Sequence, residues 1–195
     1  GRAGYWEGRA QEALGQTQAA HDAFAFAARH QTAFYGQLAA ERLGMDLDPA
    51  LLADPAHPDW HGLPFARSDL LQAALLLHSA GQFYEARRFT LQLAGQLHTE
   101  DELGALAQLW LDRGEAHMAL RIAKDAAGRG ILLPRAYFPL TDLAEADLAV
   151  PADLTLSIAR RESEFDHRVT SHADARGLMQ VMPATGRRYG ITNLY

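Results

Sequence analysis

The sequence predicts an all-α protein, and its composition gives the first two reasons. Alanine and leucine contribute 37 and 29 of the 195 residues, whereas the β-branched and aromatic residues typical of strands are scarce. Hydrophobic residues make up 48% of the chain and charged residues 22%, which is enough apolar material for a packed core. The third reason is that apolar residues recur with the period of a helix along much of the chain.

The clearest pair of predicted helices lies near the middle of the chain. Thr99 and Glu102 have the spacing of a capping box, and apolar residues follow at helical spacing as far as Leu111. After a break at Gly114, a stripe of small residues continues to Gly128, where a helix end is expected. Because the connection is short, the two helices are predicted to pack antiparallel.

Earlier segments repeat this arrangement. A helix capped by Ser68 ends at Gly81 and another follows it, and the intervals from Gly15 to Gly81 and from Gly81 to Gly114 are 66 and 33 residues. Helix pairs that recur about every 34 residues are typical of tetratricopeptide-like repeats. The sequence therefore predicts a right-handed α-superhelix of such helix pairs, interrupted by a proline-containing connection at residues 45–66.

Changes in composition predict three parts of the chain. Residues 1–130 are expected to form the α-superhelical domain, residues 131–150 a linker, and residues 151–195 a further unit. Residues 1–150 contain 12 Lys and Arg against 19 Asp and Glu, and such an acidic surface repels phosphate. Nucleic acid is therefore not an expected partner. No apolar run approaches the roughly 20 residues of a transmembrane helix.

His57 and His61 lie four residues apart, a spacing that suits two metal ligands on one face of a helix. Pro58 disfavours a continuous helix there, and the sequence offers no third ligand nearby. We therefore interpret both as surface histidines, and we expect neither a metal ion nor a cofactor. The sequence also contains no phosphate-binding glycine loop and no nucleophile elbow.

A candidate for catalysis occurs in a helix predicted at residues 151–164, which starts with a proline and an early aspartate. The expected apolar stripe of this helix consists of Leu154, Ile158, Glu162 and Phe165. This spacing places Glu162 on the inward face, where burial favours the protonated carboxyl that a general acid needs. Alternatively, the helix frays after Arg161 and Glu162 faces water. The neighbouring acids Glu164 and Asp166 are expected to be solvated.

Two motifs of this region resemble those of the soluble lytic transglycosylase family. Residues 157–163 read Ser-Ile-Ala-Arg-Arg-Glu-Ser, and residues 177–185 read Gly-Leu-Met-Gln-Val-Met-Pro-Ala-Thr. The family has an alanine-rich helix that ends in Glu-Ser and then, at this separation, a Gly-Leu-Met-Gln-x-Met-Pro signature. The likeness to the catalytic domain covers residues 137–195. A weaker likeness to the family's superhelical domain is carried by Tyr5-Trp6, residues 34–36 and residues 39–44.

The resemblance implies that residues 151–195 are the beginning of a lysozyme-like catalytic domain, with Glu162 as its single acid and base. Glu162 would protonate the glycosidic oxygen between N-acetylmuramic acid and N-acetylglucosamine. It would then accept the proton of the muramyl 6-hydroxyl as a 1,6-anhydro ring closes. The same resemblance implies a periplasmic or cell-envelope location and a peptidoglycan glycan strand as the bound partner. The implied substrate-binding residues are Ser171, Gly177, Gln180 and Met182.

The sequence departs from the family pattern at three places. Arg161 stands where glutamine is common, and residues 172–174 replace a frequent Pro-Val-Gly. The family's catalytic domain continues beyond the position of Tyr195, so the resemblance predicts that this chain is truncated at its C-terminus and inactive. Two alternatives stay open. One is a non-catalytic helical scaffold that binds a protein or a glycan strand, and the other is a muramidase in which Asp166 or Asp174 supplies a second carboxylate.

Overall fold

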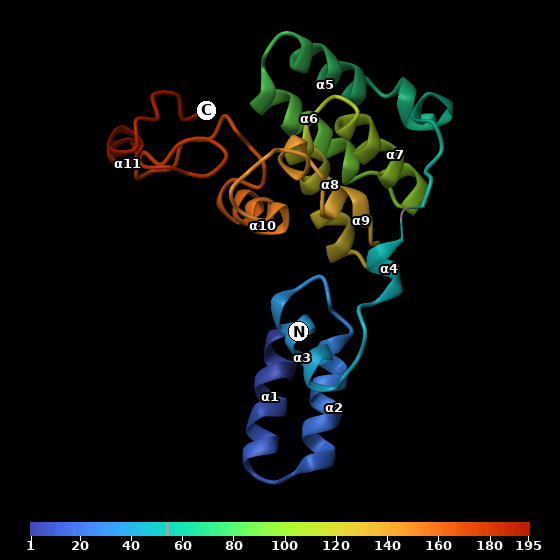
Figure 1. The fold of residues 1–195 in the computed structure, drawn as a ribbon. Coiled ribbons are helices and arrows are strands. Elements are labelled where there is room, and N and C mark those ends of the chain that lie inside the picture. The colour runs from blue at the N-terminus through green and yellow to red at the C-terminus, as the bar shows by residue number, and fades with distance from the viewer. Residues whose placement is uncertain (54) are drawn as a thin grey trace. The chain divides into compact units, whose positions relative to one another are not determined.

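The computed structural model describes residues 1–53 and 55–195, and the chain divides into two compact units, Gly1–Ala53 and Asp54–Tyr195 (Figure 1). Apart from two isolated β-bridges, all regular elements of the described residues are helices. The predicted all-α class is therefore confirmed. The break between the units falls inside the proline-containing connection that the sequence predicts.

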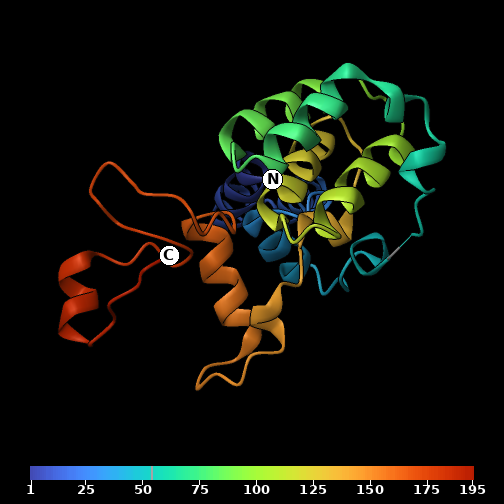
Figure 2. The same cartoon turned by 90° about the horizontal axis from the view of Figure 1, so that it is seen from above.

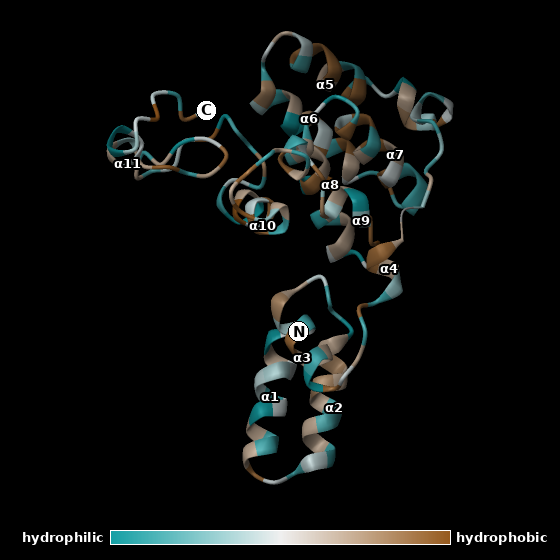
Figure 3. Ribbon diagram, in the orientation of Figure 1, coloured by the Kyte–Doolittle hydropathy of each residue, from teal (hydrophilic) through white to brown (hydrophobic). Residues whose placement is uncertain are grey.

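The first unit is built from helices α1 (Arg2–Ala13), α2 (Thr17–Ala28), α3 (Phe34–Arg42) and α4 (Pro49–Leu52). Tyr5 and Phe24 are buried among the alanine side chains of α2 and α3, and their rings lie 5.8 Å apart. Gly8 lets α1 approach α2 closely, since a Cβ at this position would lie 2.6 Å from the Phe24 ring. Hydrophilic and hydrophobic residues alternate along α1 and α2 in Figure 3, as expected for helices with one buried face.

The core of the second unit is formed by α5 (Asp69–Ser79), α6 (Phe83–Ala94), α7 (Glu100–Leu111) and α8 (Ala116–Gly128). Helix α5 packs on α6 and α7 packs on α8, which are the pairs that the sequence predicts. The Ser68 cap and the capping box are also confirmed, and Thr99 Oγ1 accepts a hydrogen bond from the Glu102 amide at 3.2 Å. Trp110 is fully buried in this core.

Short helices occupy the stretches that the sequence predicts to be irregular. They are η1 (Trp60–Gly62), η2 (Pro64–Arg67), α9 (Pro134–Tyr137) and η3 (Asp142–Ala144). Leu133 and Ala136 are buried in the same core as α7 and α8, so the first part of the predicted linker packs along these helices. Within the described part of the chain, every helix is too short or too polar to cross a membrane.

The last two helices are α10 (Ala152–Glu162) and α11 (Pro183–Arg188). Figures 1 and 2 show α10 beside the helices of the second unit, and an irregular chain that leads from it to α11. The domain boundaries expected from the sequence, 1–130, 131–150 and 151–195, stay a prediction.

Candidate active site

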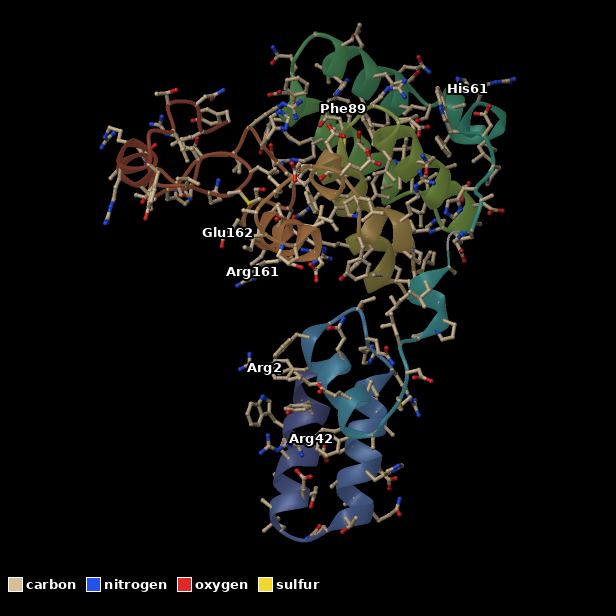
Figure 4. The ribbon with its side chains drawn as sticks, viewed as in Figure 1. Arg2, Arg42, His61, Phe89, Arg161 and Glu162 are labelled. Carbon is tan, nitrogen blue, oxygen red and sulfur yellow. The ribbon has the colours of Figure 1, made fainter. Side chains whose placement is uncertain are left out.

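Glu162 is the last residue of α10, and its side chain lies exposed at the surface (Figure 4). The prediction that Leu154, Ile158 and Glu162 face inward is wrong, because Leu154 and Ile158 are 48% and 42% exposed. The buried face of α10 is displaced by one residue and contains Thr155 and Ala159. Glu162 therefore faces solvent, which is the alternative that the sequence left open, although the helix does not fray before it.

A small apolar cluster accounts for the orientation of α10. Ala159 and Phe165 pack with Leu120 of α8, which is fully buried. A methyl group at Ala159 allows closer approach of α10 to α8 than the branched side chains of Leu154 or Ile158 would. Phe165, which is 6% exposed, is the member of the predicted stripe that the structure places inside. Packing against α8, and not the count of apolar residues, thus decides which face is buried.

Ser163, next to Glu162, joins the end of α10 to the second motif. Its side chain is buried, and Oγ lies 3.1 Å from the carbonyl oxygen of Ala159 and 2.7 Å from that of Leu178. A hydroxyl has one hydrogen, which at these distances is directed mainly to Leu178. Because Leu178 belongs to the Gly-Leu-Met-Gln-Val-Met-Pro segment, the structure brings the two sequence motifs into direct contact.

Glu164 is held on α8 by three contacts. Its carboxylate pairs with Arg121 at 3.2 Å and with Lys124, and its carbonyl oxygen lies 2.9 Å from Nδ1 of His117. Burial raises the pKa of Glu164, but the hydrogen bonds from Lys124 and Arg121 outweigh it, so the pKa lies below its ordinary value. Both Glu164 and Phe165 have left-handed backbone conformations, with φ of 52° and 64°. The expectation that Glu164 is solvated is therefore wrong.

The two acids considered as second carboxylates are each paired with an arginine. Asp166 Oδ2 lies 3.6 Å from Arg87, and its Oδ1 accepts a hydrogen bond from the Arg168 amide at 3.1 Å. The Asp166 side chain is only 19% exposed, so it too is less solvated than the sequence predicts. Asp174 lies at the surface and pairs with Arg176 at 2.9 Å.

A second charged cluster anchors the chain that follows Asp166. The Arg168 guanidinium donates two hydrogen bonds to the Glu115 carboxylate at 2.9 and 3.0 Å, and lies 3.7 Å from the centre of the Phe83 ring. His78 Nε2 lies 2.8 Å from the same carboxylate. Burial raises the pKa of Glu115, yet its bonds with Arg168 and His78 leave that pKa below the ordinary value. The cluster therefore contains an ionised carboxylate between two basic groups.

The predicted substrate-binding residues lie in one compact loop. Ser171 Oγ accepts a hydrogen bond from the Ala175 amide at 3.0 Å and closes a short turn. Gln180 Nε2 donates to the carbonyl oxygens of Gly177 at 2.9 Å and Val169 at 3.3 Å. The structure thus brings Ser171, Gly177 and Gln180 together, and it uses the Ser171 and Gln180 side chains to hold the loop. Their roles toward a substrate stay predictions.

Gly177 and Met182 lie at the two ends of this loop segment. Gly177 has φ of 67°, and a Cβ there would lie 1.7 Å from the carbonyl oxygen of Leu194. The absence of a side chain at Gly177 therefore lets the backbone of Leu194 pack closely against the Gly177 backbone in this structure. Met182 precedes α11 and is 43% exposed, so it is not a core residue.

His57 and His61 do not form a joint site in the structure. The His57 ring lies against Gly104, where a Cβ would be 2.3 Å from the ring, and His61 Nδ1 lies 2.6 Å from Asp59. In residues 1–53 and 55–195, no group of three or more His, Cys, Asp or Glu side chains has the arrangement of a metal site.

Sequence reasoning missed the residues that anchor the site. Ser163 is visible in the first motif, but nothing in the sequence indicates that it bonds to Leu178. The Glu164 carboxylate pairs with Lys124 and Arg121, which lie 40 and 43 positions earlier, and Arg168 pairs with Glu115, which lies 53 positions earlier. Periodicity carries no signal of such pairs. Their only sequence signal is an excess of charge around Glu162, which is more often a solvated surface.

Comparisons with known proteins agree with the motifs. The Transglycosylase SLT domain family matches residues 140–193. A curated Haemophilus influenzae sequence, named as a soluble lytic murein transglycosylase, is 38% identical over 55 residues, which cover 28% of this chain and 9% of that protein. The match includes only a small part of the curated relative.

Solved structures match nearly the whole chain. The 70 kDa soluble lytic transglycosylase of Escherichia coli superposes with a TM-score of 0.71 over 97% of this chain and 31% of its own, at 22% identity. An inactive variant of the lytic transglycosylase Slt from Pseudomonas aeruginosa gives a TM-score of 0.72 over 98% of this chain and 32% of its own, at 29% identity. This chain spans about a third of each solved structure. The domain match shows that the chain carries an SLT domain segment, and the comparisons together show that the chain is similar to soluble lytic transglycosylases.

Proposed function

We propose that this protein is a peptidoglycan lytic transglycosylase in which Glu162 is the only catalytic acid and base. The observation that carries the proposal is the bond from Ser163 to Leu178, because it places the Glu-Ser motif directly beside the signature loop. Glu162, the residue before Ser163, is exposed there and accessible to a polymeric substrate. The proposed substrate is the β-1,4 bond between N-acetylmuramic acid and N-acetylglucosamine in a glycan strand, and the proposed location is the periplasm or cell envelope.

The chemistry needs one carboxyl group that acts twice. Protonated Glu162 gives its proton to the glycosidic oxygen as the bond to the anomeric carbon breaks. The resulting carboxylate accepts the proton of the muramyl 6-hydroxyl while the 6-oxygen bonds to the anomeric carbon. Glu162 regains its proton, no water enters the product, and the reaction requires no metal ion or cofactor.

The loop residues would bind the acetamido and hydroxyl groups of the sugars. The Ser171 oxygen accepts a hydrogen bond from Ala175, so its own hydrogen is available to a substrate. Gln180 uses Nε2 to hold the loop, which leaves Oε1 to accept a substrate N–H or O–H. The exposed Met182 would offer an apolar surface to a sugar ring.

The test uses the protein at its full natural length, with purified peptidoglycan as substrate. Glu162→Gln keeps the size of the side chain and removes the transferable proton, so cleavage should fall by about 10² or more. Asp153→Asn, an exposed acid on the same helix, is the matched control and should retain activity. Full activity of the Glu162→Gln protein would refute the role of Glu162, whereas absence of cleavage by the wild-type protein would favour a non-catalytic scaffold.

The same assay separates transglycosylation from hydrolysis. The muramidase alternative requires a second carboxylate, and both Asp166 and Asp174 are paired with arginines. Mass spectrometry of the products should therefore show 1,6-anhydro ends, which are lighter than hydrolytic ends by one water molecule. Predominantly reducing ends would refute the transglycosylase reaction. The expectation that the 195-residue chain by itself is inactive is tested by assaying it beside a version that is lengthened through a full catalytic domain.

A further inference from the structure

We propose that Glu164 is a positioning residue that fixes the place of Glu162 by anchoring the end of α10 to α8. The proposal deepens the proposed function, since it rests on Glu162 being the catalytic acid. Glu164 lies two positions after Glu162, and its carboxylate forms ion pairs with Arg121 and Lys124 of α8.

The partners of Glu164 form one continuous face of α8. His117, Arg121 and Lys124 are separated by four and three residues, so they lie above one another on the helix. His117 Nδ1 lies 2.9 Å from the Glu164 carbonyl oxygen. Because a carbonyl oxygen can only accept, His117 donates this hydrogen bond from Nδ1. Backbone and side chain of Glu164 are thus both bound to a rigid helix, which locates the residue in position and in orientation.

The backbone at Glu164 also requires such support. Left-handed conformations are unfavourable for residues other than glycine, and two occur in succession at Glu164 and Phe165. They persist where surrounding contacts determine the backbone, and such residues cluster at functional sites. Here the contacts are the ion pairs of Glu164 and the burial of Phe165 against Leu120. The turn that these residues make ends α10 directly after Glu162.

Glu162 is consequently fixed from two sides. Ser163 binds the signature loop through Leu178, and Glu164 binds α8, while the Glu162 side chain itself stays exposed. Because Ser163 and Glu164 are consecutive, loss of the α8 contact would let the end of α10 shift relative to the loop that would hold the sugar. Small displacements of a catalytic group are costly in rate, since proton transfer depends on the distance between the groups.

The ionisation state of Glu164 distinguishes a positioning role from that of a catalytic acid. Burial raises the pKa of Glu164, and the bonds from Lys124 and Arg121 lower it further than burial raises it, so the carboxylate is charged near neutral pH. A group in that state has no proton to give to a glycosidic oxygen. Its contribution is therefore to hold the backbone, and it should act on the rate through Glu162.

The first experiment measures the anchor without using activity. Amide hydrogen exchange of the 195-residue chain is compared between wild type and Glu164→Gln, which keeps the size of the side chain and removes its charge. Exchange at residues 162–168 should accelerate about tenfold, while the buried core of α7 should be unchanged. Glu145→Gln, which changes an exposed acid, is the matched control and should leave residues 162–168 protected. Unaltered exchange in the Glu164→Gln protein would overturn the proposal.

The second experiment measures the effect on catalysis in the natural protein. Glu164→Gln should lower kcat about tenfold and change KM less than about twofold, because the substrate-binding loop is not altered. The double variant Glu164→Lys, Lys124→Glu restores an ion pair of reversed sign and should recover most of the kcat lost by Glu164→Lys alone. An unchanged kcat in Glu164→Gln, or failure of the reversed pair to recover it, would overturn the positioning role. If Glu162→Gln is fully active, the proposed function fails instead, and the exchange experiment still decides whether Glu164 anchors α10.

Discussion

Replacing Arg168 by methionine tests how strongly the chain after the candidate acid is bound to the helices. The substitution removes two charge-assisted hydrogen bonds to Glu115, whose side chain is 9% exposed, and keeps an apolar side chain over Phe83. Breaking a fully buried pair costs about 3–5 kcal/mol. Here the Arg168 side chain is 34% exposed and His78 stays on the carboxylate, so we expect a loss of about 2 kcal/mol. For a unit of this size that corresponds to a fall in Tm of about 4–8 °C.

The assay is urea and thermal unfolding followed by circular dichroism at neutral pH. Arg176→Met is the matched control, because Arg176 pairs with Asp174 at the surface, where an ion pair contributes little to stability. If Arg168→Met destabilises the protein no more than Arg176→Met does, the cluster is not an anchor and the reasoning is refuted.

The pH dependence gives a second check on the same substitution. The pKa of Glu115 is lower in the folded protein than its ordinary value of 4.5, so the unfolded state takes up the proton first as the pH falls. The stabilisation from Glu115 is therefore present above about pH 4.5 and is lost as the pH falls through the lower folded value. The unfolding free energies of wild type and Arg168→Met should differ most at neutral pH and converge in acid. A difference that is independent of pH would contradict the role of the ionised carboxylate.

Three further predictions follow from the site. Gly177→Ala should destabilise the signature loop by about 1 kcal/mol or more, because alanine is strained at positive φ and meets the Leu194 carbonyl; increased proteolysis of the loop would show it. Burial lowers the pKa of His117 below 6.5, so wild-type stability should fall as the pH drops below about 6.5, and His117→Asn should lack this fall in urea titrations; parallel curves would contradict it. Residues 131–195 expressed alone should be largely unfolded, since Leu120 and the partners of the two charged clusters are missing; a dispersed amide spectrum would show the reverse.

The helices of the second unit could be predicted because their signals are local. Thr99 and Glu102 lie three residues apart and cap one helix, and the apolar stripe that begins at Leu103 needs only its own periodicity. For α10 the same reasoning placed the buried face one residue too early in the sequence. Periodicity predicts that Leu154 and Ile158 are buried, but it contains no information about the helix on which α10 packs. Close packing on α8 buries Ala159 in their place.

The anchors of the candidate site could not have been predicted in this way. Arg168 and Glu115 are 53 residues apart, and Glu164 and Arg121 are 43 residues apart. Each of these side chains, taken alone, has the pattern of a solvated surface charge. Only the fold shows that two charged clusters fix the ends of the segment 164–168, which follows Glu162. One cluster binds Glu164 within α8, and the other binds Arg168 at the N-cap of α8.

These contacts bear on how the helical region and the candidate catalytic segment act together. The residues that hold Glu164 and Arg168 all precede the predicted linker. They include Glu115, the N-cap of α8, and Arg121 and Lys124 within α8. An acid that is exposed needs a fixed backbone more than a buried one does, because no surrounding side chains restrict it. Since α8 supplies that restriction, the helices can influence the candidate chemistry without contacting a substrate. A helical region that served only as a scaffold for partners would have no need to bind Glu164 and Arg168.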